Sequence, residues 1–198
     1  YLLSFVNNYF EHQLTADDVV WTYSGVRPLY NDGASSATAA TRDYVLKLDQ
    51  TGAPLLNIFG GKITTYRRLA ESALQKLTPF FPQASAPWTA GVALPGGDFA
   101  VGGVNQLVAQ LRNLHPSLGA ADALRLVRTY GTEAVAVLKD GPGRDFGGGL
   151  SEAEVRWQMA HEWARRAEDV VWRRTKLGLR MTADEIAALD AFMQDAVH

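Results

Sequence analysis

Hydrophobic residues beyond about position 104 recur every three or four places, the spacing of one face of an α-helix. The pattern predicts helices over 104–114, 120–130, 132–138, 151–176 and 182–197. The last two predicted helices start with a capping box, Ser151-x-x-Glu154 and Thr182-x-x-Glu185. In a capping box the hydroxyl and the carboxylate each accept one backbone N–H that the helix start would otherwise leave unpaired. These two residue patterns therefore predict helix starts at 151 and 182.

The longest predicted helix, 151–176, has an apolar stripe at steps of four residues: Val155, Met159, Trp163, Ala167 and Val171. Glu162 with Arg166, and Asp169 with Arg173, are spaced as ion pairs between successive helical turns. A stripe of this kind is typical of a helix that faces the core of a bundle. The alternative is a face that binds a partner.

The first 77 residues have a mixed pattern. After a short amphipathic stretch at the start, β-branched, aromatic or alternating segments predict strands over 18–23, 43–48 and 54–59. The third strand ends at two glycines, and beyond them the apolar spacing changes to three and four residues, which predicts a helix to about 77.

These elements predict an α+β fold with short antiparallel or mixed strands and one helix in the first third, followed by an all-α helical bundle. Four of the eight prolines fall within 78–103, which is typical of a linker. The predicted organisation is a strand-and-helix part over 1–77, a Pro/Gly-rich linker over 78–103 and a helical domain over 104–198.

Composition narrows the function classes. The 198 residues are 47% hydrophobic and 20% charged, as in ordinary globular domains. A net charge of −2 argues against nucleic acid as a partner, and the absence of cysteine excludes disulfides and thiolate metal sites. The chain starts at Tyr1 and contains no apolar run of membrane-spanning length, so we expect a piece of a longer protein whose membrane contact is peripheral.

Two motifs fail on inspection. His161-Glu162-x-x-Arg165 begins like a zinc-binding helix, but an arginine occupies the second ligand position. The segment that ends at Gly60-Gly61-Lys62 invites comparison with a phosphate-binding loop, yet Leu56 stands where the first glycine of such a loop belongs and Ile63 where a hydroxyl would bind magnesium. Metal-dependent proteolysis and nucleotide triphosphate hydrolysis are therefore not predicted from these segments.

Three cations follow predicted strands or turns. Lys62 starts a helix directly after a strand and two glycines, where backbone N–H groups favour an anion. Arg27 and Arg42 lie at strand ends, and arginine binds phosphate or carboxylate oxygens with a forked pair of donors. The cations either converge on one small anion, or the arginines form surface pairs with Asp32, Asp43 or Asp49 and the Gly60-Gly61 corner is an ordinary turn.

Taken together, several segments resemble the FAD-dependent, quinone-reducing (aerobic) glycerol-3-phosphate dehydrogenases. The resemblance covers essentially the whole chain, in order and spacing. It rests on W-T-Y-S-G-V-R-P-L at 21–29, T-R-D-Y at 41–44, G-G-K-I-T-T-Y-R-R-L-A-E at 60–71, L-P-G-G-D at 94–98, R-T-Y-G at 128–131 and the charged pattern from Glu154 to Thr175.

The resemblance implies roles for the cations. Arg27 would bind the phosphate of glycerol 3-phosphate, Arg42 would line the same pocket, and Lys62 would lie beside the substrate hydroxyl and the flavin as a catalytic residue. Backbone contacts to the FAD would come from Gly61, Lys62, Ile63 and Thr64. The reaction implied is oxidation to dihydroxyacetone phosphate with hydride transfer to FAD and electrons passed to quinone. Lys62 would act either as a cation that stabilises the alkoxide or as a base.

The family also has an amino-terminal FAD-binding region that these residues do not include, so we expect the isolated chain to be inactive and not to retain FAD. The parent enzyme would be cytoplasmic and peripheral on the inner membrane. The alternatives are a glycerol-3-phosphate oxidase with oxygen as acceptor, and a helical module that docks on a protein or membrane without catalysis.

Overall fold

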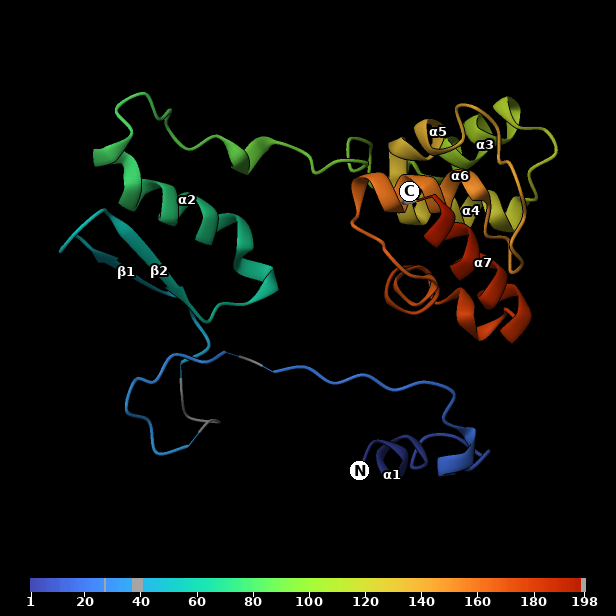
Figure 1. Cartoon of the computed structure of the whole chain (residues 1–198), viewed down its shortest axis with the longest axis horizontal. Coiled ribbons are helices and arrows are strands. Elements are labelled where there is room, and N and C mark those ends of the chain that lie inside the picture. Colours follow the sequence, from blue (N-terminus) through green and yellow to red (C-terminus); the bar gives the residue numbers. More distant parts are fainter. Residues whose placement is uncertain (27, 37–40, 197–198) are drawn as a thin grey trace. The chain divides into compact units, whose positions relative to one another are not determined.

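A computed structural model of the chain describes residues 1–26, 28–36 and 41–196. The chain divides into two compact units, Tyr1–Val92 and Ala93–His198 (Figure 1). The first contains the strands and the second is helical, which confirms the predicted α+β class.

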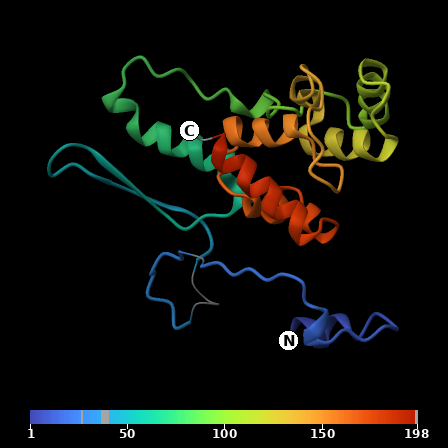
Figure 2. The ribbon, with the colours of Figure 1, turned by 45° about the vertical axis from the view of Figure 1, so that its right-hand side comes forward.

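The first unit is built on an antiparallel hairpin. Strand β1 (Val45–Asp49) pairs with β2 (Leu55–Phe59), and the register places Val45 opposite Phe59. Helix α2 (Tyr66–Leu77) follows the hairpin and contacts β2 (Figure 2). The Tyr44 hydroxyl, just before β1, lies 3.1 Å from the Ser72 hydroxyl on α2. Both of the later predicted strands and the helix are thus confirmed.

The strand predicted over 18–23 is wrong. Helix α1 (Leu2–Val6) is followed by a 3₁₀ turn (Ala16–Asp18), and the described residues between this turn and β1 form no strand. The sheet within the described residues consists of β1 and β2. A β-branched and aromatic run needs a neighbouring strand to satisfy its backbone groups, and none pairs with 18–23 here.

The first unit has no buried core of its own. None of its described residues is buried, and large apolar side chains are exposed along much of it, among them Val20, Leu55, Ile63, Leu74 and Trp88. Exposed apolar side chains in this number are typical of a surface that other protein atoms cover.

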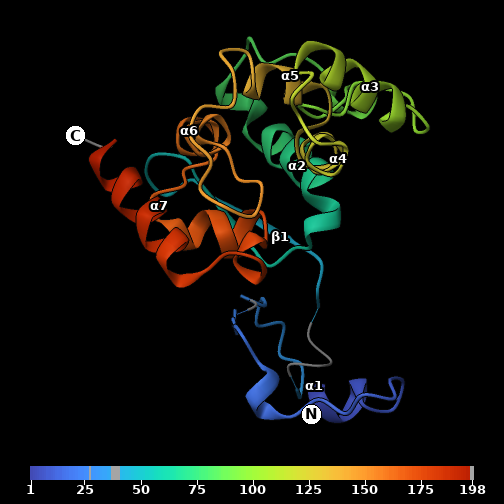
Figure 3. The ribbon, with the colours of Figure 1, turned by 90° about the vertical axis from the view of Figure 1, so that its right-hand side faces the viewer.

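The second unit contains the buried core. Its helices are α3 (Val104–Leu114), α4 (Ala120–Tyr130), α5 (Ala134–Val137), α6 (Glu152–His161) and α7 (Ala183–Asp195). The first two match the predicted ranges 104–114 and 120–130. One apolar cluster joins α3, α4 and α5 around Leu111 and Leu126, and a second joins α6, α7 and residues 164–181 around Val155 and Leu189 (Figure 3).

Two glycines allow the first residues of this unit to pack closely against the end of α4. Gly96 and Gly131 both have positive φ, and Thr132 N donates to Gly96 O at 3.0 Å. A Cβ on Gly131 would lie 1.8 Å from Gly96 O, so the two backbones leave no room for a side chain. The L-P-G-G-D and R-T-Y-G segments therefore meet in space.

The single helix predicted over 151–176 is wrong. Helix α6 ends at His161, so the predicted helix is interrupted there. A π-helical turn (Asp169–Arg174) follows further along the chain. Trp163, expected in the core, is 80% exposed at φ 55°. The break is stabilised by the Asp169 carboxylate, which accepts from the backbone N–H groups of Arg165 and Arg166. Glu162 consequently pairs with Arg174 at 3.4 Å instead of Arg166.

Candidate functional site

The turn between β2 and α2 is the centre of the candidate site. Gly60 and Gly61 adopt φ of 68° and 100°, a region that glycine occupies without strain. Lys62 follows in extended conformation and precedes a 3₁₀ turn (Ile63–Thr65). The Thr65 hydroxyl donates to the Lys62 carbonyl at 2.9 Å and so fixes the backbone that carries the lysine.

The Gly60 backbone packs against two other segments. A Cβ there would lie 3.1 Å from the Asp43 carbonyl oxygen and 3.8 Å from that of Pro28. The absence of a side chain thus allows residues 28–30, 42–44 and 60–63 to meet. Between them lies a cavity of about 420 Å³, lined by Val26, Pro28, Leu29, Arg42, Gly60, Gly61, Lys62 and Ile63.

Two of the predicted cations share this cavity. Lys62 Nζ lies 3.7 Å from Asp43 Oδ1, with the two side chains 50% and 79% exposed, so the pair is open to solvent. Arg42 forms no ion pair with any carboxylate in the part of the chain that the structure describes. Its guanidinium is therefore available to an anion in the cavity.

The carboxylates proposed as surface partners of the arginines are engaged elsewhere. Asp32 accepts from the backbone N–H groups of Thr41 and Ala34, which lower its pKa. The backbone N–H and hydroxyl of Thr51 lower the pKa of Asp49 in the same way.

The structure places two of the three other residues predicted to contact FAD at this cavity. Gly61 and Ile63 line the cavity with Lys62, whereas Thr64 is the next residue of the turn and is not among the lining residues. Arg27 lies outside the described residues. No element of the sequence pattern indicated that Asp43 would pair with Lys62.

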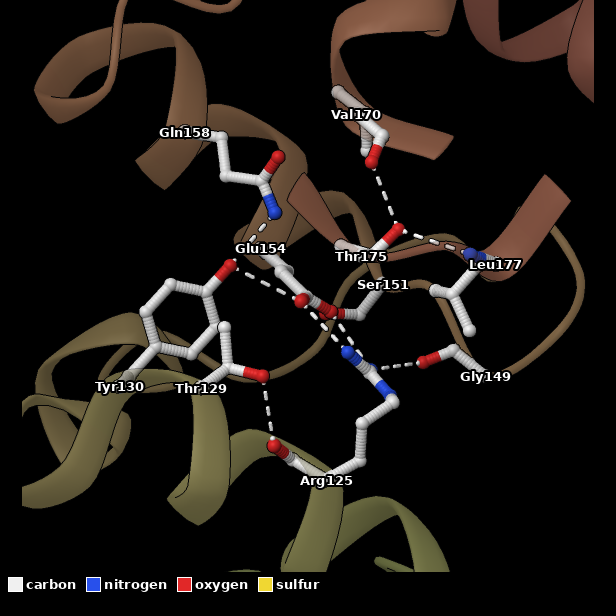
Figure 4. Close-up of polar contacts among 10 residues, drawn as sticks. All are labelled: Arg125, Thr129, Tyr130, Gly149, Ser151, Glu154, Gln158, Val170, Thr175 and Leu177. Carbon is white, nitrogen blue, oxygen red and sulfur yellow. Dashed lines mark hydrogen bonds and ion pairs between the residues drawn. The ribbon is translucent and has the colours of Figure 1, made fainter. Parts of the chain in front are cut away.

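A second polar centre, in the helical unit, was missed by the sequence reasoning. Glu154 is fully buried, and its two oxygens accept from Arg125 Nη1 at 2.7 Å and Nη2 at 2.8 Å (Figure 4). The Tyr130 hydroxyl donates to Glu154 at 3.0 Å and accepts from Gln158 Nε2 at 2.7 Å. Arg125 also donates to the Gly149 carbonyl at 2.7 Å. This set is called the buried network below.

The network takes Glu154 away from the capping role predicted for it. Ser151 accepts from Glu154 N at 3.3 Å, so the helix start is confirmed, while the carboxylate turns inward. At the other predicted start, Thr182 and Glu185 form the complete capping box. Glu154 and Gln158 stand four residues apart beside the apolar stripe, a spacing that could have indicated a buried polar pair.

Electrostatics within the buried network favour the ion pair. Burial acts to lower the pKa of Arg125, but the hydrogen bonds and charge of Glu154 outweigh it and the pKa is raised. Burial and the neighbouring Glu154 carboxylate raise the pKa of Tyr130 far above its ordinary value, so its hydroxyl remains a donor. The network holds α4 and α6 together, and the Glu154 carboxylate within it is fully buried.

Among residues 1–26, 28–36 and 41–196, no group of three or more His, Asp or Glu side chains is arranged to hold a metal ion. Within the same ranges no helix has the length and apolar character needed to cross a bilayer.

Comparison with known proteins gives consistent relatives. The chain is 47% identical to aerobic glycerol-3-phosphate dehydrogenase of Escherichia coli K12, over 93% of this chain and 38% of that protein. It is 44% identical to D-erythritol 1-phosphate dehydrogenase of Brucella abortus, over 99% and 40%. It is 45% identical to glycerol-3-phosphate dehydrogenase of Pseudomonas aeruginosa, over 98% and 39%. The chain thus spans about two fifths of the length of these relatives.

A family described as the C-terminal domain of alpha-glycerophosphate oxidase matches residues 87–195. That range is more than half of the chain and includes all five helices of the second unit together with the buried network. The chain therefore belongs to the family of C-terminal domains of alpha-glycerophosphate oxidase.

Proposed function

We propose that this chain supplies the phosphate-binding side of the substrate pocket in a flavin-dependent dehydrogenase that oxidises sn-glycerol 3-phosphate to dihydroxyacetone phosphate. The observation that carries the proposal is the cavity shared by Arg42 and Lys62 at the Gly60-Gly61 turn. The names of three relatives support it, since each is a dehydrogenase of a phosphorylated polyol.

Arg42 is the phosphate ligand among the described residues in this proposal. Its guanidinium is not neutralised by a described carboxylate, and it offers two parallel N–H donors to phosphate oxygens. From the resemblance, Arg27 is proposed as the phosphate ligand with which Arg42 shares the pocket. Together they would favour a phosphorylated polyol over the free polyol.

Lys62 is proposed as the catalytic residue. Its ammonium group would lie near the substrate hydroxyl, where a positive charge stabilises an alkoxide as the hydroxyl proton leaves. Asp43, 3.7 Å away, positions the lysine. Transfer of the proton to the lysine itself is the alternative.

The chain around this turn fits a flavin. The two glycines of positive φ leave backbone exposed, and Ile63 is 88% exposed beside them, so the segment offers both N–H donors and an apolar surface to a flat ring. Gly61, Lys62, Ile63 and Thr64 would hold FAD in this way. When bound, the flavin accepts the hydride from the substrate carbon.

The isolated chain is proposed not to retain FAD and to be inactive. The residues proposed to hold the cofactor belong to the first unit, in which no described residue is buried. We therefore expect this unit to need further protein surface, packed against its exposed apolar side chains, before it can hold a cofactor. Flavin absorbance that persists through purification of these 198 residues would refute this proposal.

For the electron acceptor we propose quinone, with the parent enzyme peripheral on the cytoplasmic face of the inner membrane; this rests on the resemblance described above. Oxygen is the alternative acceptor. Reduction of a soluble quinone analogue in the absence of peroxide formation would support the first, and stoichiometric peroxide would support the second.

The experiment uses the flavoprotein that carries this chain. Anaerobic mixing with glycerol 3-phosphate should bleach the flavin absorbance, and Lys62→Met should slow the bleaching by about 10²- to 10³-fold, as loss of one charge-stabilising group does. Lys76→Met, at the far end of α2, is the control and should bleach at the original rate. Equal rates for the two variants would exclude Lys62 from catalysis. D-erythritol 1-phosphate in parallel identifies the preferred polyol.

A further inference from the structure

A second cavity, of about 440 Å³, opens in the helical unit between one face of α4 and the segment 175–180. It is unrelated to the Arg42 and Lys62 site, which lies in the other unit. The charged and hydroxyl side chains that line it are Asp122, Arg125, Arg128, Thr129, Thr175, Lys176 and Arg180.

The charge balance of this cavity is positive in a chain whose net charge is −2. Four cations line it against one carboxylate, Asp122. Arg125 is balanced by Glu154 behind it, at 2.7 Å. Arg128 and Arg180 are exposed and form no ion pair with carboxylates of the described ranges. Arg128 and Arg180 thus line one small volume, and neither is paired with its one carboxylate, Asp122.

Both walls of the cavity are held in place. On one side the buried network fixes Arg125, and Thr129 donates to the Arg125 carbonyl at 2.9 Å (Figure 4). On the other side the Thr175 hydroxyl donates to the Val170 carbonyl at 2.8 Å and accepts from Leu177 N at 3.3 Å. The backbone that carries these cations is therefore held by hydrogen bonds on both sides of the cavity.

Lys176, between Thr175 and Leu177, has φ 59° and ψ 16°. This left-handed backbone conformation is unfavourable for a residue that has a Cβ atom. Glycine would adopt it without strain, and the next residue but one is a glycine. The lysine ammonium donates to the Trp172 carbonyl, so the side chain folds back along the rim of the cavity. Strain of this kind clusters at ligand-binding positions.

We propose that this cavity binds a phosphate group, with Arg128 and Arg180 as its principal ligands and Lys176 at its rim. Forked guanidinium donors match phosphate oxygens, and a doubly charged group suits the excess of cations over Asp122. The phosphate could belong to a small soluble molecule or to an anionic lipid headgroup, because the chemistry recognised is the same.

The test titrates the ¹⁵N-labelled 198-residue chain with inorganic phosphate and follows its amide resonances by NMR. We expect saturable shifts at 128–129 and 175–180. Arg128→Ala/Arg180→Ala should weaken binding about tenfold or more, because two charge-assisted contacts are lost. Arg112→Ala/Arg166→Ala removes the same charge from exposed positions outside the cavity and should leave the affinity unchanged.

A second arm identifies the source of the phosphate group. Vesicles of phosphatidylglycerol, with phosphatidylcholine as control, are sedimented with the original chain and both double variants. Binding of phosphatidylglycerol that requires Arg128 and Arg180, without saturable binding of inorganic phosphate, supports the site with a lipid source. Binding of neither probe, or equal binding by all three proteins, overturns the proposal.

Discussion

Substitution of Glu154 by glutamine should strongly destabilise the helical unit. The carboxylate is fully buried and accepts three hydrogen bonds, two from Arg125 and one from Tyr130. Glutamine keeps the shape, removes the charge and points an N–H₂ group at donors that need an acceptor.

The expected cost follows from these contacts. Removing one partner of a buried ion pair costs about 3–5 kcal/mol, since the other charge stays buried without compensation. The Arg125 side chain is 18% exposed and keeps its bond to the Gly149 carbonyl, so the lower end, about 3 kcal/mol, is expected. That is a large share of the roughly 5–15 kcal/mol that stabilises a typical domain.

Urea denaturation of the 198-residue chain, followed by far-ultraviolet circular dichroism, measures this cost. The midpoint should fall with little change in slope. Glu152→Gln is the matched control in the same helical turn, because Glu152 is partly exposed and pairs with Arg156 at 2.8 Å; it should cost about 0.5 kcal/mol or less. Equal costs for the two variants would refute the assignment of Glu154 as a buried ion-pair partner.

Two further predictions concern backbone geometry and pH. Gly131→Ala should cost about 3 kcal/mol or more in the same assay, because its Cβ would meet the Gly96 carbonyl, whereas Gly102→Ala, with open space around it, should cost far less. Burial acts to raise the pKa of Asp169, but two backbone N–H groups and Arg173 outweigh it and hold the pKa below 3.8. Between this lowered pKa and the ordinary value of 3.8, the unfolded chain binds more protons than the folded chain. The stability that Asp169 contributes is therefore complete above about pH 3.8 and is lost as the pH falls through the lowered pKa. The difference in unfolding free energy between the original chain and Asp169→Asn should accordingly be constant at neutral pH and shrink below about 3.8; a difference that is unchanged at low pH would contradict this.

The sequence predicted elements best where local signals agreed. Helices α3 and α4 are amphipathic, and glycines at 103, 119 and 131 flank them. The hydrophobic spacing and the glycines therefore predicted the same helix ends. The break after α6 could not be predicted in this way, since no proline or glycine marks it. It depends on Asp169, whose carboxylate accepts from the backbone N–H groups three and four residues before it, and on burial of Ala164 and Ala167.

The candidate site was predicted in part. A strand, two glycines and a lysine indicated an anion-binding corner, and the structure places Arg42 at the same cavity. The Asp43 partner of Lys62 and the inward turn of Glu154 depend on which surfaces meet in the folded chain, and spacing along the sequence does not contain that information. The strand expected over 18–23 failed for the same reason, since strand formation requires a neighbour.

The contact proposed between Arg42 and the substrate phosphate is tested most directly by steady-state kinetics of Arg42→Ala in the flavoprotein that carries this chain. Loss of a forked, charge-assisted contact predicts a KM for glycerol 3-phosphate about 10- to 10²-fold higher, and a reduced preference for it over glycerol. Arg112→Ala, on the outer face of α3, should match the original enzyme. An Arg42→Ala enzyme with unchanged KM and unchanged preference would contradict the account.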